Sequence, residues 1–225
     1  MNILVVAAHP DDEVLGAGGV IARHSDDGCS VHILVMAQGV TSRGGDPNSS
    51  ETREKLASLQ RSSAAAARAL GAASTENAGF PDQEMDTVPF LELAKAVSLR
   101  VEKLRPSIVY THHHGDLNHD HRLTAEAAMV ACRSMPGCPV REFYFWETLS
   151  STEWSPKDRI FVPRVYFDIE KQIDRKVEAM RCYEHELRDY PHPRSLEGVR
   201  ILSQARGLEV GARYGEAFDV HRLIR

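Results

Sequence analysis

Residues 3–13 read Ile-Leu-Val-Val-Ala-Ala-His-Pro-Asp-Asp-Glu, an apolar run that ends in a histidine, a proline and three acids. The run over residues 3–8 is short and continuous, which predicts a strand buried on both faces of a parallel sheet. The polar residues therefore follow the carboxyl end of a core strand. Because open parallel sheets bind ligands beyond these ends, the stretch predicts both the fold class and the edge of the sheet that carries the site.

The rest of the chain alternates apolar runs with segments of helical character. Further strands are expected at residues 30–37, within 74–88, and at 107–111, 140–146 and 160–169, the last of the core. Helices are expected at residues 14–24, 51–70, 89–104, 123–133, 170–187 and 196–206, and Gly71 is expected to end the second. This alternation indicates βαβ units. The expected fold is α/β, a single-domain, Rossmann-like three-layer sandwich over residues 1–225 with a mostly parallel sheet.

The composition excludes several classes of protein. The chain has 225 residues, 42% of them hydrophobic, and a net charge of −5. This profile is typical of a globular protein and gives no reason to expect nucleic-acid or membrane binding. The apolar start is too short for a signal peptide, and the cysteines form no CxxC pair, so a cytoplasmic protein with reduced thiols is expected. The sequence leaves open whether the chain forms a homo-oligomer.

The acids after the first strand point to a metal ion. Adjacent carboxylates raise at least one pKa unless a cation compensates. His9 and Asp12 lie three residues apart across the predicted strand-to-helix turn, close enough to share one ion. Imidazole nitrogen and carboxylate oxygen suit zinc, and a catalytic zinc needs three protein ligands and an open position. The alternative is an acidic first turn that only caps a helix.

A second polar cluster can supply the third ligand. Five of the eleven histidines fall between His112 and His121, directly after the strand expected at residues 107–111. Both clusters follow strand ends and can meet at one edge of the sheet. The alternative for this cluster alone is a surface loop or a hydrogen-bonded histidine network.

Two stretches make the chain similar to a known family. AHPDDEVLGAGG (residues 8–19) and THHHGDLNHDHR (residues 111–122) resemble the LmbE-like, or PIG-L, family of zinc-dependent N-acetyl-sugar deacetylases. Later stretches fit a bacterial branch of it: WETLSSTEW, FVPRVYFDI, YPHPRS and GEAF. The resemblance covers nearly the whole chain. It implies a hydrolase that removes the acetyl group from an N-acetylated amino sugar or its conjugate.

The resemblance also implies roles for the matching residues. His9, Asp12 and His121 match the family's zinc ligands. Asp11 matches the general base, which takes a proton from the water that the zinc activates. Asp120 would orient a ligating histidine.

Position 118 departs from the family pattern. Asn118 stands where many members carry a histidine that stabilises the oxyanion or protonates the leaving amine. An amide can donate a hydrogen bond to an oxyanion but cannot deliver a proton. The acid role then falls first to Asp11, once it has accepted a proton, with His114, His119 and His192 as the other candidates.

Five residues are candidate substrate contacts, each with an ordinary structural alternative. Arg61 and Asp82 match family positions, where the alternatives are an exposed helix charge and a turn residue. Two prolines stiffen the stretch that presents His192 and Arg194, which suits a sugar or its phosphate. Arg43 lies in the turn-rich stretch at residues 39–50.

Other functions stay open at this point. A metal-dependent phosphoesterase would need a second ligand set, for which only Asp116, His119 and Glu13 are available. A catalytically impaired metal- or sugar-binding module is the other alternative, because of Asn118. The sequence does not identify the sugar.

Overall fold

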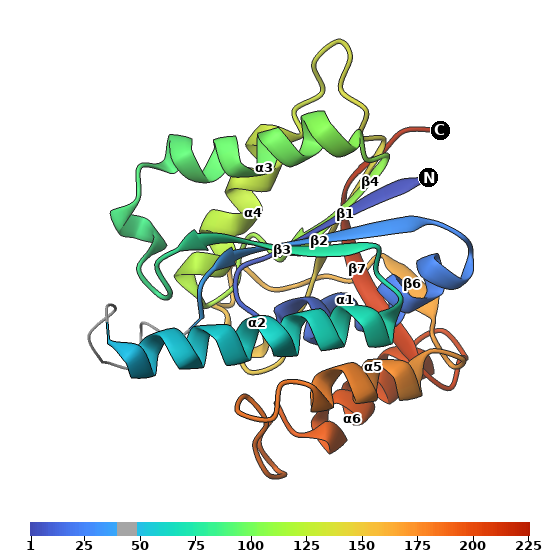
Figure 1. Ribbon diagram of the computed structural model, residues 1–225. Helices are drawn as coiled ribbons and strands as arrows, with labels where there is room; N and C mark the ends of the chain where they lie inside the picture. Colours follow the sequence, from blue (N-terminus) through green and yellow to red (C-terminus); the bar gives the residue numbers. More distant parts are fainter. Residues whose placement is uncertain (40–48) are drawn as a thin grey trace.

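A computed structural model describes residues 1–39 and 49–225 and shows one seven-stranded sheet between two layers of helices (Figure 1). The strands are β1 (Asn2–Ala7), β2 (Ser30–Ala37), β3 (Ser74–Phe80), β4 (Ile108–His112), β5 (Glu142–Trp146), β6 (Val165–Asp168) and β7 (Gly215–Leu223). Their order is β3-β2-β1-β4-β5-β7-β6. The first five of that order pair in parallel, and β7 is antiparallel to both of its neighbours. The expected α/β fold with a mostly parallel sheet is confirmed.

Helices cover both faces of the sheet. They are α1 (Asp12–Asp26), α2 (Ser50–Leu70), α3 (Phe90–Leu104), α4 (His119–Ala131), α5 (Ile173–Arg181) and α6 (Leu196–Leu208). Helices α3 and α4 cover one face, and α1, α2, α5 and α6 lie on the other (Figure 1). Helix α2 ends, as expected, at Gly71, which adopts φ 76°. Among the described helices, none has both the length and the apolar character that crossing a membrane requires.

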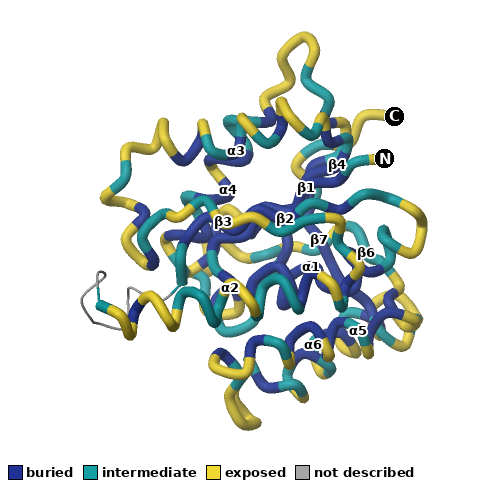
Figure 2. The backbone as a smooth tube through the Cα atoms, viewed as in Figure 1, coloured by how far each residue is buried: buried dark blue, intermediate teal, exposed yellow. Residues whose placement is uncertain are grey.

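Strand β1 lies in the middle of the sheet and is buried from both sides. Ile3, Val5 and Ala7 belong to the core under α1, while Leu4 and Val6 belong to the core under α3 and α4. Figure 2 shows this strand and the helix after it as buried. The continuous apolar run thus fits a strand with no solvent-facing side.

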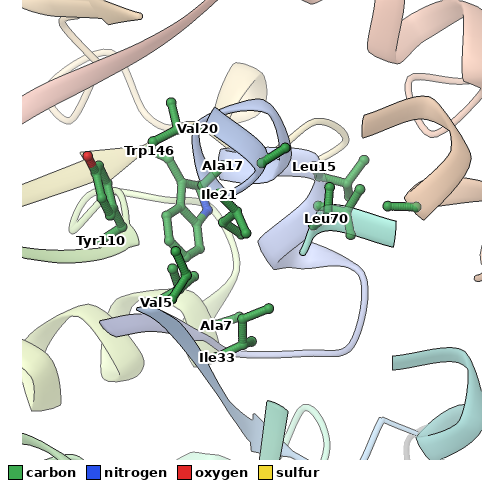
Figure 3. Packing of buried hydrophobic residues seen from close by; sticks show 14 of the residues in the cluster. Val5, Ala7, Leu15, Ala17, Val20, Ile21, Ile33, Leu70, Tyr110 and Trp146 are labelled. Atoms are coloured by element: carbon green, nitrogen blue, oxygen red, sulfur yellow. The ribbon is translucent and has the colours of Figure 1, made fainter. Parts of the chain in front are cut away.

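Helix α1 packs very closely on the sheet. A Cβ atom at Gly16 would lie 2.1 Å from the Trp146 ring, and one at Gly19 would lie 2.6 Å from Ile169. The Trp146 side chain occupies the same core as Ala17 and Val20 of α1 (Figure 3). The glycine-rich turn of α1 therefore serves helix–sheet packing, which fixes the start of α1 at the carboxyl ends of β1 and β4.

Two expectations about the last strands are wrong. The strand expected at residues 160–169 is shorter, since only β6 forms within this range. It is also not the last strand of the core, because β7 follows it in sequence and lies between β5 and β6 in the sheet. The pattern of β7 hides this strand, since Glu216 and Asp219 are charged yet buried. The alternation of apolar and polar residues assigns a charged residue to the exposed face of a strand, even where its carboxylate is buried in the core.

The helix expected at residues 170–187 is also shorter than predicted. Helix α5 ends at Arg181, and the chain continues in tight turns with hydrogen bonds from Tyr183 N–H to Met180 O and from Glu186 N–H to Tyr183 O. These turns aim the Tyr183 hydroxyl at Glu13, to which it donates a hydrogen bond of 2.6 Å. A contact with a residue 170 positions away thus accompanies the end of the helix.

Candidate metal and active site

The site begins in the turn between β1 and α1. Asp11 precedes the first residue of α1 and adopts φ 101°, in the left-handed region that few non-glycine residues occupy. Its side chain makes no capping hydrogen bond to the helix. The alternative in which this acid only caps α1 is therefore not supported, and the strained backbone points to a functional constraint.

Three predicted ligands converge beside this turn. The Oδ2 atom of Asp12 lies 3.2 Å from Nδ1 of His9 and 3.3 Å from Nε2 of His121. One ligand atom from each of the three residues lies within 4.8 Å of the others. Ligands of a tetrahedral zinc, each about 2.0–2.1 Å from the ion, are about 3.4 Å apart. The spacing and the mixed nitrogen and oxygen donor set fit zinc.

A carboxylate lies behind each histidine of this group. Asp116 Oδ1 is 3.1 Å from Nδ1 of His121, and Asp120 Oδ2 is 3.1 Å from Nε2 of His9. Such partners fix the tautomer and ring orientation of ligating histidines. The backbone N–H groups of Gln83 and Met85 donate to Asp120, at 2.8 and 3.2 Å. Asp120 therefore has the geometry expected of an orienting residue.

The pKa shifts of His9 and Asp12 show that this cluster of ligands lacks positive charge. Burial would lower the pKa of His9, but hydrogen bonds with Asp12 and Asp120 outweigh it and raise that pKa to about 10. Burial would raise the pKa of Asp12, but His121 and His112 hold it well below its usual value. A protonated imidazole thus offsets only part of the negative charge of these carboxylates. A bound divalent cation would supply the same positive charge and displace the proton.

The other histidines of the second cluster have different surroundings. His112 is fully buried, and its Nε2 accepts the N–H of Ala8 at 2.8 Å, so burial and this contact suit a neutral ring. Burial also lowers the pKa of His112 well below its usual value. His113 hydrogen-bonds Arg159 O, and His114 and His119 are exposed. Within the cluster only His121 enters the group of three ligands.

Asp11 lies beside the ligands without being one of them. Its side chain is buried, at 2% exposure, and faces a cavity of about 70 Å³ that His9 and Asp12 also line. Burial raises the pKa of Asp11 well above its usual value, and Arg194 acts against that shift. Arg194 Nη1 lies 3.4 Å from Asp11 and 3.6 Å from Glu186. An acid in this place can accept a proton and later release it.

Asn118 makes structural contacts in addition to its expected role. It is the N-cap of α4, and its Oδ1 accepts the N–H groups of Asp120 and His121, at 2.9 and 3.4 Å. Its Nδ2 donates to Gln83 Oε1 at 3.2 Å. The oxygen is thus bonded to the helix and one amide N–H to Gln83, so one amide N–H remains for an oxyanion.

The predicted substrate contacts divide into two groups. Asp82 and Arg194 line the cavity at the ligand cluster. His192 is exposed, and its Nδ1 accepts the N–H of Arg194 at 3.0 Å, so it serves its own turn. Arg61 is exposed in the second half of α2 and does not line this cavity. Arg43 lies outside the described residues.

Two residues of the site were not predicted from the sequence. Gln83 lines the cavity with φ 58°, and its Nε2 lies 3.2 Å from Nε2 of His9. Glu186 lines the same cavity opposite Arg194. The sequence signal for Gln83 was its position directly after Asp82, whereas nothing local marks Glu186.

A second metal site receives little support. The one further group of close ligands in residues 1–39 and 49–225 is His9 with Asp82 and Asp120, which shares His9 with the first. The residues proposed for a phosphoesterase do not join it. Asp116 accepts hydrogen bonds from the Ser151 and Thr152 hydroxyls, His119 is exposed, and Glu13 is bonded to Tyr183.

Comparison with known proteins identifies the family. The PIG-L family, described as GlcNAc-PI de-N-acetylase, matches residues 4–132, more than half of the chain. The chain therefore belongs to the PIG-L, or LmbE-like, family. The uncharacterized deacetylase YaiS of Escherichia coli K12 is 29% identical over 178 residues, 76% of this chain and 83% of that one. A probable N-acetyl-alpha-D-glucosaminyl L-malate deacetylase 2 of Bacillus anthracis is 25% identical over 184 residues, with 81% and 80% covered.

The fold and a relative of different activity complete the comparison. The crystal structure of the conserved protein TT1542 from Thermus thermophilus superposes with a TM-score of 0.79 at 26% identity, covering 99% of this chain and 96% of that one. A 4-oxalmesaconate hydratase of Pseudomonas putida KT2440 is 27% identical over 197 residues, 80% of this chain and 72% of that one. The deacetylase relatives support an enzyme with a deacetylase function.

Proposed function

We propose that this chain is a cytoplasmic, zinc-dependent N-deacetylase that hydrolyses the acetamide of an N-acetylated amino sugar or its conjugate. One observation carries the proposal. The buried acid Asp11 faces a cavity beside His9, Asp12 and His121 while staying outside their ligand group. A purely structural metal site has no use for such an acid.

The residues divide the work of amide hydrolysis. When bound by His9, Asp12 and His121, zinc would polarise the acetamide carbonyl and make water easier to deprotonate. Asp11 takes the proton from the attacking water. Because burial favours its protonated form, Asp11 can hold that proton and return it to the leaving nitrogen, which completes the release of acetate and a free amine.

Two other groups stabilise and orient the reactants. The Asn118 amide donates a hydrogen bond toward the developing oxyanion, a contribution that a side-chain amide can make. Asp120 holds the ring of His9 in place. Asp82 and Arg194 meet the sugar at the rim of the cavity, where they are lining residues.

An acetate-release assay with metal analysis of the same sample tests the proposal. The panel contains N-acetylglucosamine, its glycosides and N-acetylated sugar nucleotides, and we expect acetate release with one zinc per chain. His121→Ala should lose zinc and activity together, while His185→Ala, which changes an exposed histidine, should keep both. Full zinc occupancy in the His121 variant would remove this residue from the ligand set. Two ions per chain would favour the phosphoesterase.

A hydratase is the second candidate, because one relative carries that name. The charge of the cavity favours the deacetylase, since Asp11, Asp82 and Glu186 line it with Arg194 as the one described lysine or arginine. This excess of carboxylates suits an uncharged sugar better than an unsaturated tricarboxylate such as the one in the relative's name. Hydration of such a tricarboxylate without acetate release from any sugar would reverse the choice.

A further inference from the structure

The stretch WETLSSTEW begins at the last residue of β5 and has no part in the proposed hydrolysis. We name residues 148–153 within it the hydroxyl loop, because four of its six residues are serine or threonine. We propose that the hydroxyls of Ser151 and Thr152 raise the affinity of the site for zinc. They do so by fixing the Asp116 carboxylate, which orients the ligand His121. This inference rests on the proposed zinc site and assigns two positioning residues to it.

The hydroxyl loop holds both carboxylate oxygens of Asp116, a buried residue between β4 and α4. The Ser151 hydroxyl donates to Oδ1, and the Thr152 hydroxyl donates to Oδ2. The N–H of Asn118 also donates to Oδ1, at 2.8 Å, so Thr152 supplies the hydrogen bond on the other oxygen. Hydrogen bonds to an ionised acceptor are among the strong ones. A donor on each oxygen therefore sets the plane of the carboxylate and aims Oδ1 at Nδ1 of His121, 3.1 Å away.

The orientation of this carboxylate matters because of the way His121 faces the other ligands. Its Nε2 lies 3.3 Å from Oδ2 of Asp12, so Nε2 is the nitrogen available to zinc, and Nδ1 carries the proton toward Asp116. A carboxylate in this place fixes the tautomer and the orientation of the ring. A ligating nitrogen has to lie about 2.0–2.1 Å from zinc. If the carboxylate turns away from Nδ1, the ring is free to leave that position.

The hydroxyl loop is held in its conformation by hydrogen bonds of its own. The N–H of Thr148 donates to Oγ1 of Thr152 at 2.7 Å, which leaves the hydroxyl proton of Thr152 for the carboxylate. The N–H groups of Ser150 and Ser151 donate to the Glu153 carboxylate, at 2.7 and 3.0 Å. Ser150 adopts φ 66°, a left-handed conformation that persists where the surroundings over-determine the backbone, as they do at functional sites. The two hydroxyls are thus set in place by the loop.

The zinc affinity of the metal-free protein, measured by competition with a chelating dye, tests the inference. The double variant Ser151→Ala with Thr152→Val removes both hydroxyls at nearly constant volume and should bind zinc about 10–100-fold more weakly. Thr152→Ser keeps the hydroxyl and should stay near the wild-type affinity. The matched control is Ser155→Ala, which removes a buried hydroxyl oxygen that has no hydrogen-bond partner among the described residues, and it should bind zinc like the wild type.

A double-mutant cycle shows whether the hydroxyls act through the carboxylate. Asp116→Ala should itself weaken zinc binding, and Thr152→Val in that background should change the affinity by less than about twofold, because its partner is gone. An equal loss from Thr152→Val with and without the carboxylate would overturn the inference. So would a double variant of Ser151 and Thr152 that is less stable to urea in its metal-free form but keeps the wild-type zinc affinity, since the loop would then only support the fold.

Zinc affinity and acetate release together separate this inference from the proposed function. Weaker zinc binding in the double variant of Ser151 and Thr152, with no acetate release from the zinc-loaded wild type, would retain the positioning role and overturn the deacetylase. Acetate release from the wild type, with unchanged zinc affinity in the double variant, would retain the deacetylase and overturn the positioning role.

Discussion

Two buried polar clusters contact α1, and they differ in one respect. At the start of the helix, Asp11 and Asp12 belong to a cluster rich in carboxylates that faces a cavity. Further along, Lys176 Nζ lies 2.6 Å from Glu216 and donates to Leu15 O at 2.9 Å. Glu216 in turn accepts the N–H groups of Gly19 and Val20, both at 2.7 Å.

The difference separates a structural cluster from a reactive one. The ammonium group of Lys176 and both carboxylate oxygens of Glu216 have partners, so the pair holds α5, α1 and β7 together. The acids around Asp12 outnumber the positive charges near them, so they need a cation from outside the chain. Burial of polar groups alone therefore does not indicate a functional site. An excess of one sign of charge next to a cavity does indicate one.

The largest expected effect comes from removing the reactive charge. Asp11→Asn should keep zinc and lower kcat/KM by about 10²–10⁴-fold, the usual contribution of a general base. Acetate release and metal analysis measure the two effects. Asp27→Asn, at an exposed position just after α1, is the matched control and should change neither. Unchanged turnover in the Asp11 variant would reassign the base.

Substitution in the structural cluster of Lys176 and Glu216 should lower the stability of the fold instead. Lys176→Met leaves Glu216 buried without its partner and should cost about 3–5 kcal/mol in the free energy of unfolding. Urea denaturation measures it. Lys95→Met breaks an exposed pair with Glu92, 3.0 Å long, and should cost less than about 1 kcal/mol.

The double variant Lys176→Met with Glu216→Leu sharpens the test. It removes both charges, so no buried charge is left without its partner. Much of the lost stability should return. If the double variant loses as much unfolding free energy as the two single variants together, Lys176 and Glu216 do not act as a coupled pair.

Gln83 offers a smaller effect at the reactive cluster. Gln83→Gly should keep the unfolding free energy within about 1 kcal/mol, because relief of the left-handed backbone offsets the greater freedom of glycine in the unfolded chain. Loss of the amide at the cavity should raise KM about 3–10-fold. Arg105→Gly, at another left-handed residue with φ 50° in the C-cap of α3, should leave KM unchanged. An unaltered KM in the Gln83 variant would make this side chain only a turn residue.

The smallest effect concerns a third polar contact of α1. Burial lowers the pKa of His24, whose Nε2 lies 2.8 Å from the Tyr110 hydroxyl. The unfolded chain then binds a proton more readily, so stability falls as the pH drops below the unfolded pKa of about 6.5. Urea midpoints at pH 7.5 and 5.5 should differ less in His24→Gln than in the wild type. An equal difference would remove His24 as a source of acid sensitivity.

Sequence reasoning recovered most of the sheet and the centre of the site. The bounds of β2 match the expected strand, because its apolar residues are continuous and end at turn formers. His9, Asp12 and His121 lie together because each follows a strand end at the same edge of the sheet. Their roles as ligands, like that of Asp11 as the base, stay predictions.

The misses share a physical cause. Strand β7 was missed because its core residue Glu216 is charged. The turns after α5 occur with a hydrogen bond from Tyr183 to Glu13. The left-handed backbone at Gln83 was missed because the residue is not a glycine. In each case a contact with a distant residue outweighs the local preference. Helical periodicity and strand alternation report only on near neighbours along the chain.

By itself, the sequence determined the buried central strand, the α/β class and the two polar clusters, because these follow from the order of apolar and polar residues. Only the tertiary structure placed Arg194 beside Asp11, 183 residues away, paired Lys176 with Glu216, and brought Glu186 into the cavity at the ligand cluster. The reason is that burial and charge balance depend on which segments pack together. That information is spread over the whole chain and appears in no single stretch of it.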